Sequence, residues 1–456
     1  MARSQLTPTT RSAADAVDPG LLASDLAALV RLPSVTGQED AIGANLADRL
    51  EVLGLEVEVF TPNPADIRDD PAWPGEEVPR SSLTVVLGRA GRRGGRRIVL
   101  SGHTDVVPAG DPATWTRAPF SGEVVGGELF GRGACDMKGG LASILGAVRA
   151  LRDTGALARL DGELVVALVP SEEDGGQGTL AAIRAGAVGD MAVITEPTGL
   201  QLVIAHAGAI TFRLTVPGRA AHASRRTEGV SALANLGTLA AALEADEARR
   251  NASEADPLMA AIGMPYPSTI GKVAGGEWAS TVMDRVVAEG RYGVRLGQTP
   301  EQAADELRAC IAAACEADPF LREHPAAVEI TGARFGSSRV AADHPLPVSL
   351  ASVAEALIGA EPARIGVPYG CDMRLFIDVG DTPCVVYGPG DVQLAHAADE
   401  RVPLAEVETC ARVLAAWVVE ELGVGGPALS GSVGPDGLPG HVGERAAPPA
   451  DSGATS

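Results

Sequence analysis

The chain is poor in aromatic residues and in positive charge. Phe, Trp and Tyr make up 3% of its 456 residues, and 37 Lys and Arg stand against 59 Asp and Glu, so that the net charge is −22. A surface this acidic repels phosphate backbones and anionic lipid headgroups, and we therefore expect no nucleic-acid partner. Because aromatic residues are few, the core must consist mainly of Ala, Val, Leu and Ile.

Long apolar runs and closely paired cysteines are also missing. No run approaches the roughly 20 apolar residues of a membrane-spanning helix, and the start of the chain lacks the apolar centre of a secretory signal. The 6 cysteines are scattered and show no Cys-x-x-Cys spacing, which is typical of a reducing compartment. We therefore expect a cytoplasmic protein that does not associate with membranes.

The order of apolar runs and helical patterns indicates the fold class. Short apolar runs that end in polar or Gly-rich turns alternate with helical patterns, which is typical of an α/β sheet covered by helices on both faces. The pattern changes at Ile210, Phe212 and Leu214, which alternate with polar residues as in a half-solvated strand. The buried runs that define the α/β pattern are 98–100, 164–169, 191–194 and 384–387.

These changes predict one α/β domain that is interrupted by a smaller α+β domain. A chain of this length is sufficient for two or three domains. A capping box formed by Thr299 and Gln302 predicts the start of a helix within the insertion. We expect the larger domain at 18–211 and 331–422, the inserted domain at 212–330, and disordered tails, rich in small and polar residues, at 1–17 and 423–456.

Metal-binding residue types follow the ends of the predicted strands, where open α/β sheets place their sites. His103 and Asp105 are two residues apart in extended chain, so they point to one side and the Asp105 carboxylate can accept the second ring N–H of His103. Imidazoles and carboxylates without thiolates suit a pair of zinc or cobalt ions. The other candidate ligands are Asp136, Glu172, Glu173, Glu196 and His396.

Each of these residues taken alone has an ordinary explanation. A single histidine is more often a hydrogen-bonded structural residue than a ligand, and single acids in loops are usually solvated charges. What favours a metal site is that acids and imidazoles follow successive strands of a sheet that should bring them to the same edge.

Six motifs, read in order, are specific when taken together. They are SGHTDVVP, GRGACDMKGG, PSEEDGG, TEPT, GRAAHAS and YGPGDVQLAHAADERVP. With them, the chain from about Asp25 to about Leu422 resembles the cocatalytic dinuclear zinc deacylase and exopeptidase family, which includes acetylornithine deacetylase, succinyl-diaminopimelate desuccinylase, aminoacylase and carboxypeptidase G. The resemblance implies a zinc-exopeptidase-like domain with a central mixed sheet, and an inserted ferredoxin-like domain that serves as a lid and joins two subunits into a homodimer.

The resemblance also implies roles for the candidate ligands. Asp136 would bridge two divalent ions, zinc or in its place cobalt, and the peptide bond that follows it would be cis. His103 and Glu196 would complete one ion's site, and Glu173 and His396 the other's. Glu172 would be the general base for a water that attacks from between the ions.

Two further residues match family positions outside the ligand set. His222, in GRAAHAS, would reach the active site of the partner subunit and stabilise the oxyanion. Arg374 would hold the α-carboxylate of the substrate. The alternatives are an exposed loop histidine in the first case, and a structural arginine paired with Asp372 in the second.

The resemblance implies a metal-dependent amidohydrolase that acts on an N-acyl amino acid, as a deacetylase or a desuccinylase does. A dipeptidase or carboxypeptidase of the same family is the alternative. A metal-binding scaffold protein without activity is a remote alternative, because Glu172 and every ligand are present. Ser280 and Cys371 depart from the common family pattern, so the preferred acyl group does not transfer from the best-known members.

Overall fold

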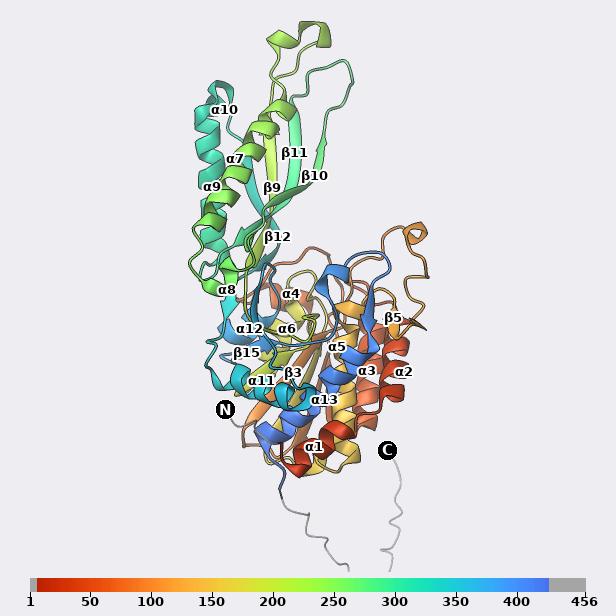
Figure 1. Ribbon diagram of the computed structural model, residues 1–456. Coiled ribbons are helices and arrows are strands. Elements are labelled where there is room, and N and C mark those ends of the chain that lie inside the picture. The colour runs from red at the N-terminus through yellow and green to blue at the C-terminus, as the bar shows by residue number, and fades with distance from the viewer. Residues whose placement is uncertain (1–5, 426–456) are drawn as a thin grey trace, which may run out of the picture.

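The computed structural model describes residues 6–425, which form a larger α/β domain and an inserted α+β domain that projects from it (Figure 1). The main sheet of the larger domain has the strand order β1-β2-β6-β3-β7-β15-β8-β13, and β14 pairs with β8. Its strands are β1 (Glu56–Phe60), β2 (Val85–Gly91), β3 (Arg97–His103), β6 (Glu163–Val169), β7 (Met191–Ile194), β8 (Leu202–His206), β13 (Ser338–Arg339), β14 (Arg364–Val367) and β15 (Cys384–Val386).

The centre of this sheet is parallel and its flanks are antiparallel. Strands β6, β3, β7 and β15 run parallel to one another, whereas β2 pairs antiparallel with β6 and β8 pairs antiparallel with β15. Every residue of β6 is buried, as expected for a strand covered on both faces. The predicted mixed sheet is therefore confirmed.

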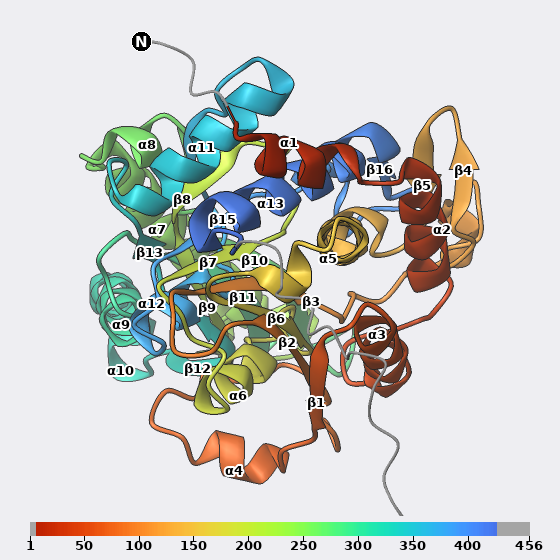
Figure 2. The same cartoon turned by 90° about the horizontal axis from the view of Figure 1, so that it is seen from below.

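Helices cover both faces of the main sheet. The long helices α5 and α13 pack together on one face, and α6 and α12 lie on the other (Figure 2). A small sheet, β4 (Glu123–Val125), β5 (Glu128–Phe130) and β16 (Arg401–Pro403), lies at the periphery. The helices are α1 (Pro8–Asp15), α2 (Pro19–Val30), α3 (Asp40–Val52), α4 (Pro64–Arg68), α5 (Gly139–Asp153), α6 (Gln177–Arg184), α11 (Pro345–Ile358), α12 (Met373–Asp378) and α13 (Leu404–Leu422).

The inserted domain is an antiparallel sheet with helices on one face. Buried Phe212 and Leu214 of β9 pack against Leu239 of α7 and Leu307 of α9 in a separate core. The capping box predicted at Thr299 and Gln302 begins α9. The elements of the insertion are β9 (Gly208–Pro217), β10 (Thr269–Gly275), β11 (Arg285–Val294), β12 (Ala327–Phe335), α7 (Ala232–Ala252), α8 (Pro257–Ala260), α9 (Pro300–Ala317) and α10 (Pro319–Glu323).

The inserted sheet extends slightly beyond the range expected for it. Its first strand begins at Gly208 rather than 212, and its last ends at Phe335 rather than 330. The difference arises because β9 and β12 remain paired down to Ala209 and Phe335, where the chain crosses between the domains.

The expectation of a disordered start is wrong for residues 8–15, which form α1. Thr7 caps this helix by accepting the N–H of Thr10, and Pro8 occupies its first turn. Ala13 and Ala14 are fully buried, and the helix packs on α13. The small residues that suggested a disordered tail therefore allow α1 to pack closely against α13. Of the tail expected at 423–456, residues 426–456 lie outside the described part.

No helix within residues 6–425 is both long enough and apolar enough to cross a membrane. The longest helix of the described chain, α7, carries charged residues throughout its second half, at 244–250.

Candidate active site

The candidate ligands gather at the carboxyl edge of the parallel strands. His103 is the last residue of β3, Glu172 and Glu173 lie in the turn after β6, and Glu196 lies two residues beyond β7. Parallel strands present their carboxyl ends at one edge, so residues far apart in sequence meet there. Asp136 approaches from the segment before α5. The peptide bond between Asp136 and Met137 is cis, which confirms that expectation.

The two oxygens of Asp136 face different histidines. Oδ1 lies 3.0 Å from Nε2 of His103, and Oδ2 lies 3.4 Å from Nε2 of His396. Glu196 is 3.5 Å from His103, and Glu173 is 3.1 Å from His396. The five side chains therefore form two half-sites that share one carboxylate. Ligand atoms of His103, Asp136 and Glu173 lie within 4.8 Å of one another, as do those of His103, Glu172 and Glu196.

Asp105 acts on this cluster differently from what its spacing predicted. Nδ1 of His103 is 2.9 Å from the main-chain carbonyl of Asp105, and 3.6 Å from its carboxylate. The carboxylate instead accepts the backbone N–H groups of Glu172 and Glu173, at 3.1 and 3.2 Å. The main chain of Asp105 thus orients the imidazole, and its side chain holds the turn that carries both glutamates.

Glu400 is a functional candidate that the sequence analysis missed. This buried carboxylate accepts the N–H groups of Cys135 and Asp136, at 2.9 and 3.0 Å, and it pairs with Arg132. It therefore fixes the backbone from which the Asp136 side chain projects. The motif AADERVP contained Glu400, but its position just before β16 gave no signal that it reaches Asp136.

Burial gives these acids unusual proton affinities. It raises the pKa of Glu173 to about 7 and that of Glu196 to about 8, and the pKa of Glu172 lies well above its usual range for the same reason. Burial would also raise the pKa of Asp136, but the hydrogen bonds from His103 and His396 hold it well below its usual range. Asp136 and Glu173 in turn raise the pKa of His396 to about 10.

The two imidazoles of this cluster do not balance its four carboxyl groups, those of Asp136, Glu172, Glu173 and Glu196. One oxygen of Glu196, Oε1, is buried without a hydrogen-bond partner in the described part of the chain. An unpaired buried carboxylate oxygen is costly unless a cation contacts it. The donor set of two imidazoles and several carboxylates therefore fits a pair of divalent metal ions.

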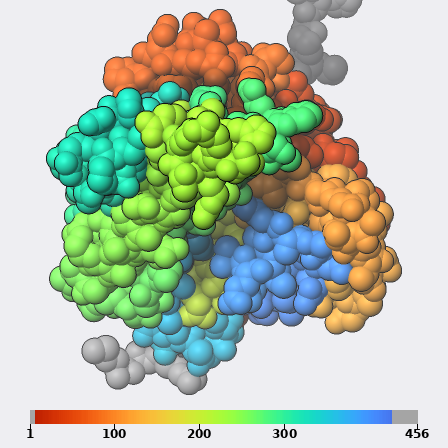
Figure 3. All heavy atoms as spheres, turned by 90° about the horizontal axis from the view of Figure 1, so that it is seen from above, coloured from red at the N-terminus to blue at the C-terminus, as the bar shows by residue number. Residues whose placement is uncertain are grey.

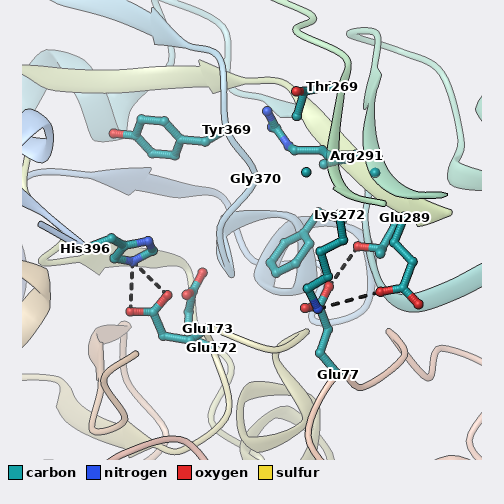
Figure 4. Close-up of a pocket in the computed structure, with 15 residues that line it drawn as sticks. Glu77, Glu172, Glu173, Thr269, Lys272, Glu289, Arg291, Tyr369, Gly370 and His396 are labelled. Atoms are coloured by element: carbon teal, nitrogen blue, oxygen red, sulfur yellow. Dashed lines mark hydrogen bonds and ion pairs between the residues drawn. The ribbon is translucent and has the colours of Figure 1, made fainter. Parts of the chain in front are cut away.

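A cavity of about 530 Å³ opens beside this cluster, between the two domains (Figure 3). Glu172, Glu173 and His396 line one side of it, and strands β10 and β11 of the inserted domain line the other (Figure 4). Asp136 and Glu196 line a smaller adjoining space of about 260 Å³. A small molecule in the cavity would therefore contact both the ligand cluster and the inserted domain.

Arg291 is the second residue that the sequence analysis missed. It lies on β11, lines the cavity, and donates to the carbonyl of Pro368 at 3.0 Å. Burial lowers the pKa of its guanidinium. No ion pair joins it to an acid among the described residues. The sequence alone assigned no role to any residue of this strand.

Arg374 is not among the residues that line either cavity. Its guanidinium is buried, donates to the carbonyls of Cys371 and Gly175 at 2.7 and 2.6 Å, and stacks over Phe335. Asp372 lies 3.8 Å away. These contacts favour the structural alternative for Arg374 over the carboxylate clamp.

His222 lies far from the ligand cluster of its own chain. It follows β9, which starts beside the larger domain and runs outward for 10 residues, or roughly 33 Å. The yellow-green turn Ala223–Glu228 occupies the outer end of the inserted domain (Figure 1). Nδ1 of His222 accepts the N–H of Ser224, so the exposed Nε2 is left to carry the ring proton.

Comparison with known proteins identifies relatives. The sequence pattern of the family described as Peptidase family M20/M25/M40 matches residues 99–420. Succinyl-diaminopimelate desuccinylase of Methylorubrum extorquens is 38% identical over 234 residues, which cover 48% of this chain and 56% of that protein. The chain thus matches about half the length of this curated relative.

Two more distant relatives cover more of the chain. N-formyl-4-amino-5-aminomethyl-2-methylpyrimidine deformylase of Bacillus subtilis is 26% identical over 343 residues, or 71% of this chain and 78% of that protein. The structure of Sso-CP2, an M20 family metallo-carboxypeptidase from Sulfolobus solfataricus, aligns with a TM-score of 0.68 at 17% identity, and covers 88% of this chain and 98% of its own. The last comparison shows that the fold is shared.

Proposed function

Because the chain belongs to peptidase family M20/M25/M40, we propose that it is a metal-dependent hydrolase that removes an acyl group from an amino acid with a free carboxylate. The observation that carries the proposal is the pair of half-sites joined by Asp136, which opens into a cavity between two domains. Two relatives are named for the removal of acyl groups, a desuccinylase and a deformylase. A dipeptidase or carboxypeptidase is the second candidate, because Sso-CP2 shares the fold.

In this proposal His103 and Glu196 would hold one divalent ion, Glu173 and His396 would hold the other, and Asp136 would be available to both. Zinc or cobalt at these positions would polarise an amide carbonyl and make a water acidic at neutral pH. Asp105 and Glu400 keep the ligands in place through the hydrogen bonds described above.

Glu172 is the proposed general base. It follows a strand beside the ligands and lines the cavity, and burial raises its pKa above that of an exposed carboxyl group, so that it holds a proton more readily. It would take the proton of the attacking water and deliver it to the leaving amine. Hydrolysis of the amide then yields a free acid and an amine without a covalent intermediate.

Arg291 is better placed than Arg374 to bind the substrate's carboxylate. Its side chain lines the cavity opposite Glu172, and no acid pairs with it among the described residues (Figure 4). A half-buried guanidinium without an anion favours a carboxylate ligand. The donors of Arg374 are directed at main-chain carbonyls.

We propose that His222 serves the active site of a second subunit in a homodimer. Its position at the outer end of the insertion is too far from the Asp136 cluster of its own chain for direct contact with substrate. The Nε2 proton left free by the Ser224 contact is the donor that a developing oxyanion requires.

A substrate panel tests the proposal. The zinc-loaded or cobalt-loaded protein is assayed on N-acetyl, N-succinyl, N-formyl and N-aminoacyl amino acids, each with a free and with an amidated α-carboxylate. We expect hydrolysis of at least one acyl class, with the free acid preferred by at least about tenfold, since a charged hydrogen bond to carboxylate contributes about 1.5 to 3 kcal/mol. Equal rates on free and amidated forms would refute carboxylate recognition, and no turnover on any member would refute the deacylase proposal.

A further inference from the structure

Three glycines meet where the two domains touch. Gly75 belongs to residues 73–80, which we call the bridging segment and which precede β2. A Cβ on Gly75 would lie 2.3 Å from the carbonyl oxygen of Gly332 in β12, and a Cβ on Gly175 would lie 2.7 Å from the carbonyl oxygen of Gly75. All three have positive φ. The bridging segment is therefore packed, main chain against main chain, between the inserted sheet and the turn after β6.

Two hydrogen bonds attach the bridging segment to the inserted domain. The N–H of Arg334 donates to the carbonyl of Pro74 at 2.7 Å, beside a register shift in β12. The hydroxyl of Thr211 donates to the Glu77 carboxylate at 2.8 Å. Thr211 lies on β9 directly across from Arg291 on β11. Glu77 is therefore hydrogen-bonded to the residue that lies across the sheet from Arg291, the proposed binding residue for the substrate's carboxylate.

The other end of the segment holds the turn that carries Glu172 and Glu173. Arg80, whose side chain is fully buried, donates to Asp174 at 2.8 Å and to Glu39 at 3.2 Å. The N–H of Val78 donates to the second oxygen of Asp174 at 3.3 Å. Asp174 directly follows Glu173, so the segment fixes the turn through side-chain and main-chain contacts.

We infer that the bridging segment sets the distance between Arg291 and Glu172, with Glu77 and Arg80 as positioning residues; this inference rests on the proposed function. A substrate held at its carboxylate by Arg291 presents its amide carbonyl at a fixed distance from that contact. The bridging segment contacts both the strands beside Arg291 and the turn that carries Glu172, so a few consecutive residues fix the distance between them. A displacement of about 1 Å between the two ends costs on the order of 10²-fold in rate.

A double-mutant cycle separates this role from direct substrate contact, because both Glu77 and Thr211 line the cavity. Glu77→Ala, Thr211→Val and the double variant are assayed on the preferred substrate and on its α-amide. We expect each single variant to lower kcat/KM about tenfold for the free acid, the double variant to lose no more than either single one, and the amide, which Arg291 does not hold, to lose clearly less than the free acid. The inference would be overturned if the losses of the two single variants multiplied in the double variant. It would also be overturned if kcat/KM fell as much for the amide as for the free acid.

Hydrogen exchange tests the coupling without any substrate. Gly332 lies in the inserted domain, outside the residues that line the cavity. The Cβ added by Gly332→Ala would displace Glu77, so this variant should accelerate the exchange of backbone amide hydrogens in residues 171–176. Glu329→Gln, an exposed position on the same strand, is the matched control and should leave that exchange unchanged. Glu77→Ala, at an exposed position, gives the same test with little risk to folding.

The two proposals fail in different ways. If the native enzyme does not distinguish free from amidated substrates, carboxylate recognition is wrong, whereas the exchange experiment still reports on the bridging segment. If the native enzyme prefers the free acid and neither Glu77→Ala nor Gly332→Ala changes exchange in residues 171–176, the bridging segment does not couple the domains.

Discussion

The carboxyl edge of the main sheet and the outer end of the inserted domain carry motif residues of very different kinds. At the edge, acids and imidazoles from five separate segments each lie about 3 to 3.5 Å from at least one other, and all of them except the exposed His396 are largely buried. At the outer end, His222 is exposed, and the hydrogen bonds of its Nδ1 within the described residues are to Ser224, two positions along the chain. The edge is complete within one chain, whereas His222 has a chemical role only if another molecule comes to it.

Metal removal should have the largest effect, because it acts on the edge as a whole. Chelation should abolish turnover, and zinc or cobalt should restore it, since the buried carboxylates need cations to be charged together. The measurement is metal content alongside activity. We expect close to two ions per chain in the native protein. Asp136→Asn should weaken the binding of both ions. Full turnover in a metal-free preparation would contradict the proposed site.

Glu172→Gln tests the edge without touching a ligand. Turnover should fall by about 10² to 10⁴, the usual effect of losing a general base, while metal content stays at the native level. Asp48→Asn, at an exposed position of α3, is a control for the removal of one acid. If Glu172→Gln keeps the turnover of the native enzyme, Glu172 is not the general base and another acid of the cluster must serve instead.

His222→Ala tests the outer end. Turnover should fall by about 10² to 10³ with both metals retained, as for one oxyanion donor. After subunits of this variant are exchanged with those of Glu172→Gln, a mixed dimer has one site with an intact base and an intact neighbouring histidine. Activity should therefore reappear. If mixed dimers verified by mass stay inactive, His222 does not act between subunits.

Arg291→Ala should mainly raise KM, by about tenfold or more for a free-acid substrate, because a carboxylate contact stabilises the ground state and the transition state together. Arg291→Lys should recover part of the loss, since it keeps the charge without the fork of donors. The free-acid preference should disappear in the Ala variant. A native preference in Arg291→Ala would point to a different carboxylate contact.

Substitution of His206 should have the smallest effect on activity. Unlike His396, this histidine has a pKa below that of an exposed imidazole. Burial lowers its pKa to about 4, against 6.5 for an exposed histidine. The folded state then binds fewer protons than the unfolded state between these values, so stability falls as pH drops from about 6.5 towards 4. Over this window the free energy of unfolding of the native protein, measured by denaturant titration at each pH, should fall more steeply than that of His206→Gln, by about 2 kcal/mol at pH 5. Parallel curves would contradict a buried neutral His206.

The sequence predicted the edge well, because its residues follow buried strands that a parallel sheet must align. His103, Glu172, Glu173 and Glu196 could be found in this way without any structure. Arg291 and Glu400 could not, because their roles depend on how distant segments fold back against the cavity and against Asp136. Spacing alone also misassigned the Asp105 carboxylate, since a main-chain carbonyl two residues away competes for the same ring nitrogen.

The chain leaves the larger domain and returns to it at nearly the same point. A Cβ on Gly208 would lie 2.1 Å from the carbonyl oxygen of Phe335, so entry and exit of the insertion are in contact. Strand β8 pairs with β13 and β14, which lie beyond the whole insertion. If the insertion folds first around its own core, the long loop between these strands becomes a short one, and its closure entropy falls. The order of folding should therefore run from the insertion to the last strands of the main sheet, and damage to the inserted core should slow assembly of a sheet it does not belong to.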